Sequence, residues 1–215
     1  SRGLGDVYKR QSEYWVTSML KAATKAHAIG KPWVLDPVGA GATTYRDETV
    51  AQLLDYKPTV IRGNASEIMA LAKASQTKTK GVDSIHQSTE AIEAALWLNQ
   101  TVVSVVCISG ATDVVVSGNE KVLLKNGHPM MQQVTGLGCS ASALIGAFVA
   151  NDSANPLEAT AAAMALLSIA GELAEKQSAG PGSLQVNLLD KLYNITEDEF
   201  LTHLNVEHYS ESVSV

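Results

Sequence analysis

Helix and strand patterns alternate along the first half of the chain. Apolar residues recur three and four positions apart in some segments, which predicts amphipathic helices, whereas short continuous apolar runs predict strands buried on both faces. The predicted helices cover residues 13–29, 46–54, 67–72 and 88–98, and the predicted strands cover residues 33–35, 58–61 and 101–108. This alternation predicts an α/β fold in which helices flank both faces of a parallel sheet.

The second half of the chain departs from this alternation. Turn residues at 117–120 separate the apolar segments 114–116 and 121–124, which predicts a β-hairpin. Helices are predicted over residues 140–150 and 156–174, with a final element over residues 184–192. Residues 73–86 are polar, which predicts a surface loop. The tail from residue 210 is polar as well. No apolar run approaches the roughly 20 residues that a membrane-spanning helix needs.

Composition limits the kind of protein this can be. The chain has 215 residues, of which 46% are hydrophobic and 18% are charged, as in an ordinary globular domain. Its net charge of −6 argues against a nucleic-acid partner, which would favour a basic surface. The two cysteines, Cys107 and Cys139, are too few for a disulfide framework and lack the spacing of a metal site. We therefore expect a cytoplasmic protein that binds neither nucleic acid nor a membrane.

One stretch, residues 134–143, combines glycines, a cysteine and small residues directly before an apolar run. Gly136 and Gly138 would let the backbone approach a ligand closely, and the start of the following helix offers N–H groups to an anion. Cys139 would stand at that junction, where the helix dipole favours a thiolate. A glycine turn before a core helix, with Cys139 as a small buried residue, explains the same pattern about equally well.

Polar residues follow all three predicted strands of the first half. Asp36 comes directly after the first strand, Arg62 after the second and Ser109 after the third. Arg62 suits phosphate groups, and the oxygens of the nearby Asn64 and Glu67 suit the water shell of a magnesium ion. Plainer interpretations are a helix cap or turn residue at Asp36, a turn at Ser109, and a helix cap at Asn64 or Ser66. Since parallel strands end at one edge of a sheet, we expect these residues to converge on one site.

Four motifs occur together in this chain. They are Asp36-Pro37-Val38-Gly39-Ala40-Gly41, Arg62-Gly63-Asn64-Ala65-Ser66-Glu67-Ile68, Thr135-Gly136-Leu137-Gly138-Cys139 and Gly180-Pro181-Gly182-Ser183. As a set they resemble the hydroxyethylthiazole kinase family of the ribokinase-like superfamily, from about residue 33 to about residue 189. The resemblance implies a three-layer sandwich with a mostly parallel central sheet flanked by helices. It also implies ATP-dependent phosphorylation of the hydroxyl of hydroxyethylthiazole in thiamine biosynthesis or salvage, with Mg²⁺, by a homotrimer.

The resemblance further implies a role for each of nine residues. The residues that would bind ATP are Arg62, Asn64 and Ser109. Those that would form the substrate-binding site and anion hole are Thr135, Gly136 and Gly138. Those that would hold Mg²⁺ are Asp36 and Glu67, and Cys139 would be the catalytic base at the position where most ribokinase-like enzymes carry an aspartate. A strong base is not required, because positioning and charge stabilisation dominate phosphoryl transfer.

The chains of that family begin well before the helix predicted at residue 13, and their first portion supplies early strands and part of the thiazole pocket. The resemblance therefore implies a non-native or disordered leader over residues 1–11, followed by one N-terminally truncated kinase domain over residues 12–215. Two other functions stay open. One is another ribokinase-like small-alcohol kinase, such as one for hydroxymethylpyrimidine, against which Cys139 argues. The other is an inactive nucleotide-binding fragment.

Overall fold

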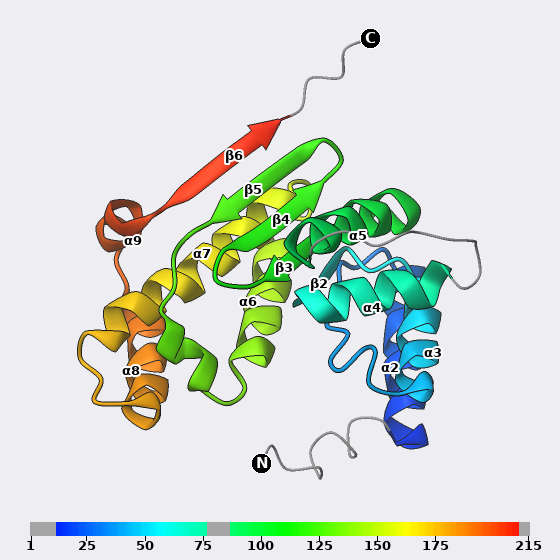
Figure 1. Cartoon of the computed structure of the whole chain (residues 1–215), viewed down its shortest axis with the longest axis horizontal. Helices are drawn as coiled ribbons and strands as arrows, with labels where there is room; N and C mark the ends of the chain where they lie inside the picture. Colours follow the sequence, from blue (N-terminus) through cyan, green and yellow to red (C-terminus); the bar gives the residue numbers. More distant parts are fainter. Residues whose placement is uncertain (1–11, 77–86, 211–215) are drawn as a thin grey trace.

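A six-stranded mixed sheet forms the centre of the computed structural model, which describes residues 12–76 and 87–210 (Figure 1). The strands are β1 (Val34–Leu35), β2 (Val60–Asn64), β3 (Val105–Ser109), β4 (Asp113–Ser117), β5 (Glu120–Leu124) and β6 (Val206–Ser210), and they lie in this order across the sheet. The helices are α2 (Glu13–Ala28), α3 (Thr44–Leu54), α4 (Ala65–Gln76), α5 (Gln87–Val102), the 3₁₀ helix η1 (Pro129–Gln133), α6 (Leu137–Asn151), α7 (Pro156–Glu175), α8 (Pro181–Asn194) and α9 (Glu197–His203). The predicted α/β fold class is confirmed.

The first three strands are parallel, as the alternating pattern predicts. β1 pairs with β2, and β2 pairs with β3. β2 is longer at its carboxyl end than predicted, because Arg62 and Asn64 pair with Cys107 and Ser109 instead of lying in a loop beyond the strand. Strand pairing therefore fixes the backbone of Arg62 and Asn64.

The other half of the sheet is antiparallel, and here the expectation of a mostly parallel sheet is wrong for the described strands. The predicted hairpin is confirmed as β4 and β5, while β4 also pairs antiparallel with β3 through the short turn after Ser109. The C-terminal part adds α9 and β6, and β6 pairs with β5. Neither was predicted, because α9 has 7 residues with none buried and β6 is mostly exposed, so neither carries an apolar pattern.

Several predicted boundaries move. Thr101 and Val102 end α5 rather than begin a strand, and Val103 then adopts a φ of 62° before β3 starts at Val105. The β-branched residues favoured a strand there, but tertiary packing overrides so local a preference. α4 continues to Gln76, so the first residues of the predicted loop at 73–86 are helical. Residues 77–86, the predicted leader at 1–11 and the tail at 211–215 lie outside the described residues.

Two hydrophobic clusters cover opposite faces of the sheet. On one face, α2 to α5 pack around Ile61 and Val106. On the other, α6, α7 and α8 pack around Val60 and Cys107. Neighbouring residues of one strand thus enter different clusters, as the alternation of side chains along a strand requires. Figure 1 shows the two groups of helices on either side of the sheet, which gives three layers.

α7 is long and apolar enough to span a membrane by length and composition alone. Its 20 residues contain an 18-residue window with a mean hydropathy of 1.4. The expectation that no apolar run approaches this length is therefore wrong. However, 67% of that window is buried inside the protein, where α7 packs against α6 and α8. A helix that is apolar on most sides and buried in this way is typical of a protein core.

Candidate active site

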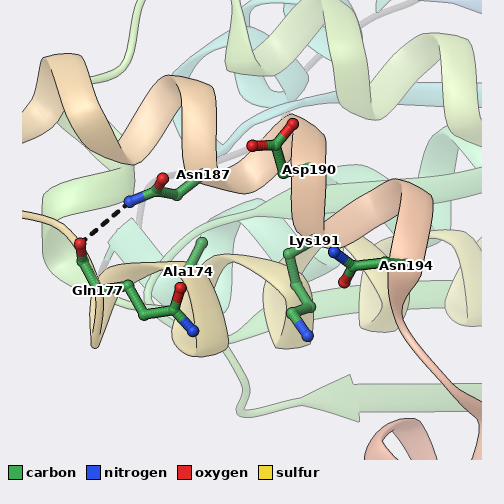
Figure 2. A pocket seen from close by; sticks show the side chains of 6 residues that line it. All are labelled: Ala174, Gln177, Asn187, Asp190, Lys191 and Asn194. Carbon is green, nitrogen blue, oxygen red and sulfur yellow. Dashed lines mark hydrogen bonds between the residues drawn. The ribbon is translucent and has the colours of Figure 1, made fainter.

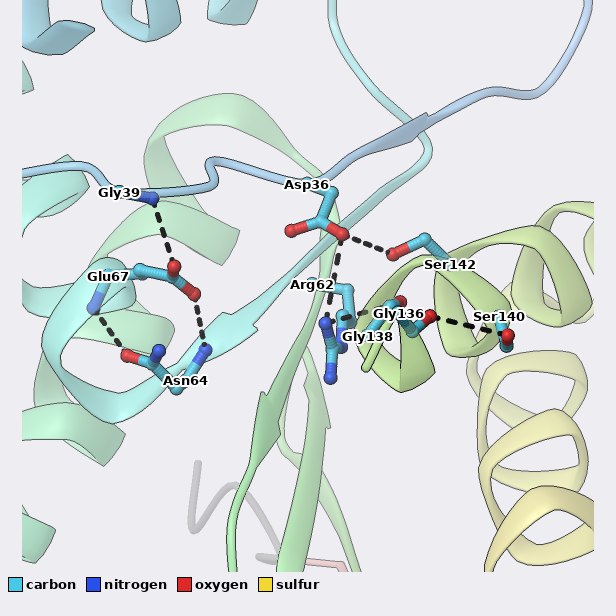
Figure 3. Close-up of polar contacts among 9 residues, drawn as sticks. All are labelled: Asp36, Gly39, Arg62, Asn64, Glu67, Gly136, Gly138, Ser140 and Ser142. Carbon is cyan, nitrogen blue, oxygen red and sulfur yellow. Dashed lines mark hydrogen bonds and ion pairs between the residues drawn. The ribbon is translucent and has the colours of Figure 1, made fainter. Parts of the chain in front are cut away.

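Arg62 lies where three elements meet, namely the ends of β1 and β2 and the start of α6 (Figure 3). Its Nη1 is 3.7 Å from Asp36 Oδ2 and donates a hydrogen bond of 3.4 Å to the carbonyl oxygen of Gly138. The Arg62 side chain is 14% exposed and that of Asp36 is 18% exposed, so solvent screens this ion pair only weakly. The structure thus brings together three predicted site residues that are far apart in the sequence.

Gly138 leaves the space that this guanidinium occupies. A Cβ at position 138 would stand 2.9 Å from Arg62 Nη1, which is closer than real Cβ atoms approach other atoms. Gly136 is glycine for another reason: it is the N-cap of α6 and has a φ of 82°, a backbone conformation that residues with a Cβ rarely adopt. The two glycines of the motif therefore serve one close approach and one left-handed turn.

α6 begins at Leu137, earlier than predicted, so Cys139 lies in the first helical turn rather than in a loop. Cys139 is exposed, and its interpretation as a small buried residue is therefore wrong. Thr135, just before the helix, is also exposed. Cys107 is buried within β3, where burial strongly raises the pKa of its thiol. Cys139 is thus the accessible thiol, and it stands at the positive end of a helix dipole.

A serine of α6 also fixes the side chain of Asp36, which follows β1. Ser142 Oγ donates a hydrogen bond of 2.7 Å to Asp36 Oδ2, the oxygen that faces Arg62. Ser142 follows Cys139 by about one turn, so the helix that carries the thiol also orients the carboxylate. Sequence reasoning missed Ser142, because a helical serine commonly bonds back to its own helix, as Ser140 does to the Gly136 carbonyl at 3.3 Å.

Asn64 and Glu67 form a second polar group beside this one (Figure 3). Asn64 Oδ1 accepts hydrogen bonds from the backbone N–H of Glu67 at 2.9 Å and from the Ser66 hydroxyl at 2.7 Å. The plainer interpretation of Asn64 as a helix cap is therefore confirmed. The Glu67 carboxylate accepts hydrogen bonds from the backbone N–H groups of Asn64 and Gly39, both at 3.0 Å. Glu67 thereby ties the start of α4 to the loop that follows Asp36.

That loop is also fixed by α3. Asp47 Oδ1 accepts a hydrogen bond of 2.7 Å from the backbone N–H of Gly41. Arg46 is only 6% exposed and lies under Gly39, where a Cβ would meet its Nη1 at 1.8 Å. Gly39 has a φ of 72°, so both its conformation and its neighbour require glycine. Sequence reasoning missed Arg46, because an arginine near the start of a helix is normally solvent-exposed.

Ser109 ends β3 and lies beside Asn64 of β2. Its hydroxyl oxygen is buried, as is Nε of Arg62, and neither atom has a hydrogen-bond partner within residues 12–76 and 87–210. Buried polar atoms are nearly always paired, so an unpaired one in a native protein needs a functional or structural explanation. Both atoms belong to residues predicted to bind ATP. If Ser109 were only a turn residue, its buried hydroxyl, which has no hydrogen-bond partner within the described residues, would have no explanation.

The fourth motif and a nearby pocket belong to another part of the molecule. Residues 180–183 start α8, and Ser183 Oγ accepts a hydrogen bond of 3.2 Å from the backbone N–H of Gly180. A polar pocket of about 190 Å³ lies between α7 and α8 (Figure 2). The residues that line it are Ala174, Gln177, Asn187, Asp190, Lys191 and Asn194, none of them a predicted site residue. Asn187 donates to the Gln177 carbonyl at 3.1 Å, and Lys191 pairs with Glu199 at 3.1 Å. We assign these contacts to the packing of α8.

The carboxylates of Asp36 and Glu67 are compatible with one mode of magnesium binding. Within the described part of the chain, no three His, Cys, Asp or Glu side chains converge as in a cage built from protein ligands alone. Mg²⁺ more often takes one or two carboxylates from the protein and completes its shell with water and substrate phosphates. Asp36 and Glu67, which follow the neighbouring strands β1 and β2, offer two carboxylates of this kind.

Comparison with known proteins then decides the family. The sequence matches the Hydroxyethylthiazole kinase family over residues 10–198, a range that contains all nine predicted site residues. A hydroxyethylthiazole kinase of Syntrophus aciditrophicus is 50% identical over 196 residues, which cover 91% of this chain and 72% of that protein. One from Arabidopsis thaliana is 48% identical over 192 residues, which cover 89% of this chain and 70% of that protein. The chain belongs to the hydroxyethylthiazole kinase family.

Solved structures agree with this membership. The structure of a hydroxyethylthiazole kinase from Pyrococcus horikoshii OT3 has a TM-score of 0.83 at 36% identity, and the match covers 93% of this chain and 74% of that one. A pyridoxal kinase from Staphylococcus aureus shares the fold, with a TM-score of 0.60 at 20% identity over 89% of this chain and 69% of that one. The predicted family, the ribokinase-like fold and the enzyme class, a kinase with an alcohol acceptor, are confirmed. The roles of single residues stay predictions.

Proposed function

We propose that this chain transfers the terminal phosphoryl group of ATP to the hydroxyl of hydroxyethylthiazole, as a step of thiamine biosynthesis or salvage. The observation that carries the proposal is the convergence of Arg62, Asp36 and the first turn of α6 at one edge of the sheet. Together they offer a cation for phosphate, a carboxylate for a metal ion and backbone N–H groups with a thiol beside them. Phosphoryl transfer depends mainly on such positioning and charge stabilisation. Family membership supplies the substrate class.

In this proposal the nucleotide lies against the ends of β2 and β3. Arg62 and Ser109 bind its phosphates, and their unpaired Nε and hydroxyl are the donors that phosphate oxygens would accept from. Asn64 shapes the same wall by holding the start of α4. The turn at Gly136 and Gly138 directs backbone N–H groups toward the transferred phosphoryl, where they stabilise its negative charge.

Cys139 acts as the base. The exposed thiol stands in the first turn of α6, at the positive end of the helix dipole. The proton of the substrate hydroxyl moves to Sγ as the new oxygen–phosphorus bond forms, and the bond between the terminal phosphorus and ADP breaks. Thr135, exposed just before the helix, contacts the substrate from the same side.

Asp36 and Glu67 would hold Mg²⁺, which when bound neutralises phosphate charge and orients the nucleotide. Ser142 keeps Asp36 Oδ2 in place, and the Glu67 carboxylate is fixed by the Gly39 and Asn64 N–H groups. Pre-oriented ligands of this kind bind a metal more tightly than mobile ones.

We further propose that the protein works in the cytoplasm as a homotrimer, with ATP and the thiazole alcohol as its small-molecule partners. The net charge of −6 and the burial of α7 argue against nucleic acid and a membrane as partners. The trimer rests on family resemblance, and sedimentation analysis of the purified chain tests it.

A coupled assay of ADP release tests the proposed reaction. The purified chain would be given ATP and MgCl₂ with hydroxyethylthiazole, hydroxymethylpyrimidine or pyridoxal, and a Cys139→Ala variant would serve as the matched control. We expect turnover with hydroxyethylthiazole and a large loss in the variant. Turnover with hydroxymethylpyrimidine alone would replace the proposed substrate. ATP binding without turnover of any alcohol, by a folded chain, would identify an inactive nucleotide-binding protein.

A further inference from the structure

Asp113 is a buried carboxylate to which the proposed reaction assigns no role. It starts β4 directly after the turn that follows Ser109, and it is only 6% exposed. In the register of the sheet, Arg62 lies beside Cys107, and Cys107 lies beside Val115. Residues two apart on a strand share a face, so Ser109 and Asp113 lie on the same face as Arg62. The sheet thus presents two residues proposed to bind ATP and a carboxylate on one face.

The contacts of Asp113 join three elements. Its Oδ1 accepts a hydrogen bond of 3.0 Å from the backbone N–H of Gly110, which closes the turn after Ser109. Ser168 of α7 also acts on the carboxylate and lowers its pKa. The positive charge of Arg62 also acts on it, and the carboxylate in turn acts on Cys107. Asp113 therefore closes the turn at the end of β3 and interacts electrostatically with Ser168 of α7 and with the guanidinium of β2.

We propose that Asp113 is a positioning residue for the nucleotide half of the site. Its carboxylate holds the Ser109–Gly110 turn and supplies a negative charge on the same face of the sheet as Arg62, which keeps the guanidinium directed toward the phosphates. This inference rests on the proposed function. Two atoms of the same face, Arg62 Nε and Ser109 Oγ, have no hydrogen-bond partner within residues 12–76 and 87–210, so the groups that Asp113 places are those left to bind a ligand.

The ionisation of Asp113 gives this role a pH dependence. Burial, as the largest effect, raises its pKa from 3.8 to about 6, while Gly110, Arg62 and Ser168 act in the opposite direction. The carboxylate is therefore charged at neutral pH and neutral in mild acid. On the surrounding elements, β5 places Leu124 opposite Asp113, β3 carries Cys107, whose pKa is strongly raised, and α7 contributes the uncharged Ser168.

The test is a comparison of Asp113→Asn with the unaltered chain in steady-state kinetics. Asparagine keeps the size of the side chain and an acceptor for Gly110 but removes the charge. We expect the KM for ATP to rise roughly tenfold, the loss of about one charge-assisted interaction, while kcat and the KM for the thiazole alcohol change little. In the unaltered chain the KM for ATP should rise as the pH falls from about 7.5 to 5.5. In the Asp113→Asn variant this rise in KM due to Asp113 should be absent.

Glu172→Gln is the matched control. Glu172 follows Ser168 by one turn of α7 but bonds to Asn126, so the loss of its charge should leave the KM for ATP unchanged. An unchanged KM for ATP in Asp113→Asn, or an equal loss in the control, would overturn the proposal. A fall of kcat together with a lower melting temperature would indicate a merely structural role and overturn it as well.

Direct binding of a fluorescent ATP analogue separates this proposal from the proposed reaction. Weaker binding by Asp113→Asn supports the positioning role even if no alcohol is phosphorylated. Equal binding by both chains overturns it even if the kinase is active. If Asp113→Asn fails to fold, Asp113→Ser removes the same charge with a smaller side chain, and the same two outcomes decide.

Discussion

The two halves of the sheet use buried polar groups in opposite ways. In the antiparallel half, Asn126 is 6% exposed and all its side-chain polar atoms are engaged. Its Nδ2 donates to the Glu172 carboxylate at 3.1 Å and to the His203 carbonyl at 2.8 Å, and its Oδ1 accepts from the backbone N–H of Asn205 at 2.8 Å. Glu172 also accepts a hydrogen bond from the backbone N–H of Gly127. This Asn126 hub joins the end of β5 to α7 and to the chain before β6.

In the parallel half, Arg62 and Ser109 at the strand ends each have a buried polar atom without a hydrogen-bond partner within the described residues. Arg62 has one ion pair at 3.7 Å and one long hydrogen bond of 3.4 Å, while its Nε lacks a partner within the described residues. A satisfied buried network stabilises one architecture, whereas a partly satisfied one has donors left over for a ligand. The comparison therefore separates a structural network from a candidate binding network without reference to the family.

The largest effect should come from Cys139. If Cys139 is the base, Cys139→Ala should lower kcat about 10²–10⁴-fold, the usual range for general-base help, while Cys139→Asp retains activity. Initial rates with saturating ATP and hydroxyethylthiazole measure this, with circular dichroism as the control for folding. Turnover of Cys139→Ala at the parent rate would show that the first turn of α6 contributes only backbone groups.

Gly138→Ala should displace Arg62, because the new Cβ would stand 2.9 Å from Nη1. We expect a loss of roughly 10² in kcat/KM for ATP, since small displacements of binding groups have effects of this size. Gly146→Ala, on the same helix, is the matched control, because its Cβ would meet Val34 at an ordinary 3.8 Å. Equal kinetics of the two variants would contradict the role of Arg62.

Ser142→Ala removes the hydrogen bond to Asp36 Oδ2. If Asp36 binds Mg²⁺, the Mg²⁺ concentration for half-maximal activity should rise roughly 10–100-fold, as for other residues that orient metal ligands. Ser140→Ala controls for the loss of a helix serine, because Ser140 bonds only to Gly136 in the contacts described. An unchanged Mg²⁺ requirement in Ser142→Ala would contradict the proposal that Asp36 binds the metal.

Asn126→Ala should change stability rather than chemistry. It leaves buried groups such as the His203 carbonyl without their partner, and each of these lowers the free energy of unfolding by about 1–3 kcal/mol. Urea unfolding measures the loss, and activity per folded molecule should stay the same. Asn155→Ala, an exposed asparagine that bonds to Asp152, should have little effect on stability. A selective loss of ATP affinity in Asn126→Ala would show that the hub belongs to the site.

The last prediction concerns stability and pH. Because the pKa of Asp113 is raised to about 6 in the folded chain, the folded state binds this proton more tightly than the unfolded state does. Its contribution to the free energy of unfolding is therefore full below about pH 4 and is lost as the pH rises through about 6. Asp113→Asn removes this dependence, so its stability relative to the parent should increase across that interval. If the free energy of unfolding, measured with urea, depended on pH in the same way for the parent and for Asp113→Asn, the raised pKa would be contradicted.

Local sequence was enough to predict much of the fold and to propose nine candidate site residues, although it missed Ser142 and Arg46. The hydrophobic periods predicted α2, α3, α7 and the β4–β5 hairpin, because those patterns report directly which side chains face a core. The four motifs contain eight of the nine predicted site residues, and the ninth, Ser109, was predicted at the end of a strand. Local pattern failed at Thr101 and Val102, where β-branched residues end a helix, and at α9 and β6, whose exposed residues carry no core period.

Tertiary structure alone decided which groups touch. Ser142 meets Asp36, Arg46 lies under Gly39, and Asp113 shares a face with Arg62, and none of these pairs is local in sequence. Each depends on strand order and helix placement, which arise from burial over the whole chain rather than from any single segment. The amino-acid sequence by itself determined most of the elements, the family and the chemical groups, because these depend on residue type and spacing. Long-range packing determined which of those groups have hydrogen-bond partners within the protein and which have donors available for a ligand.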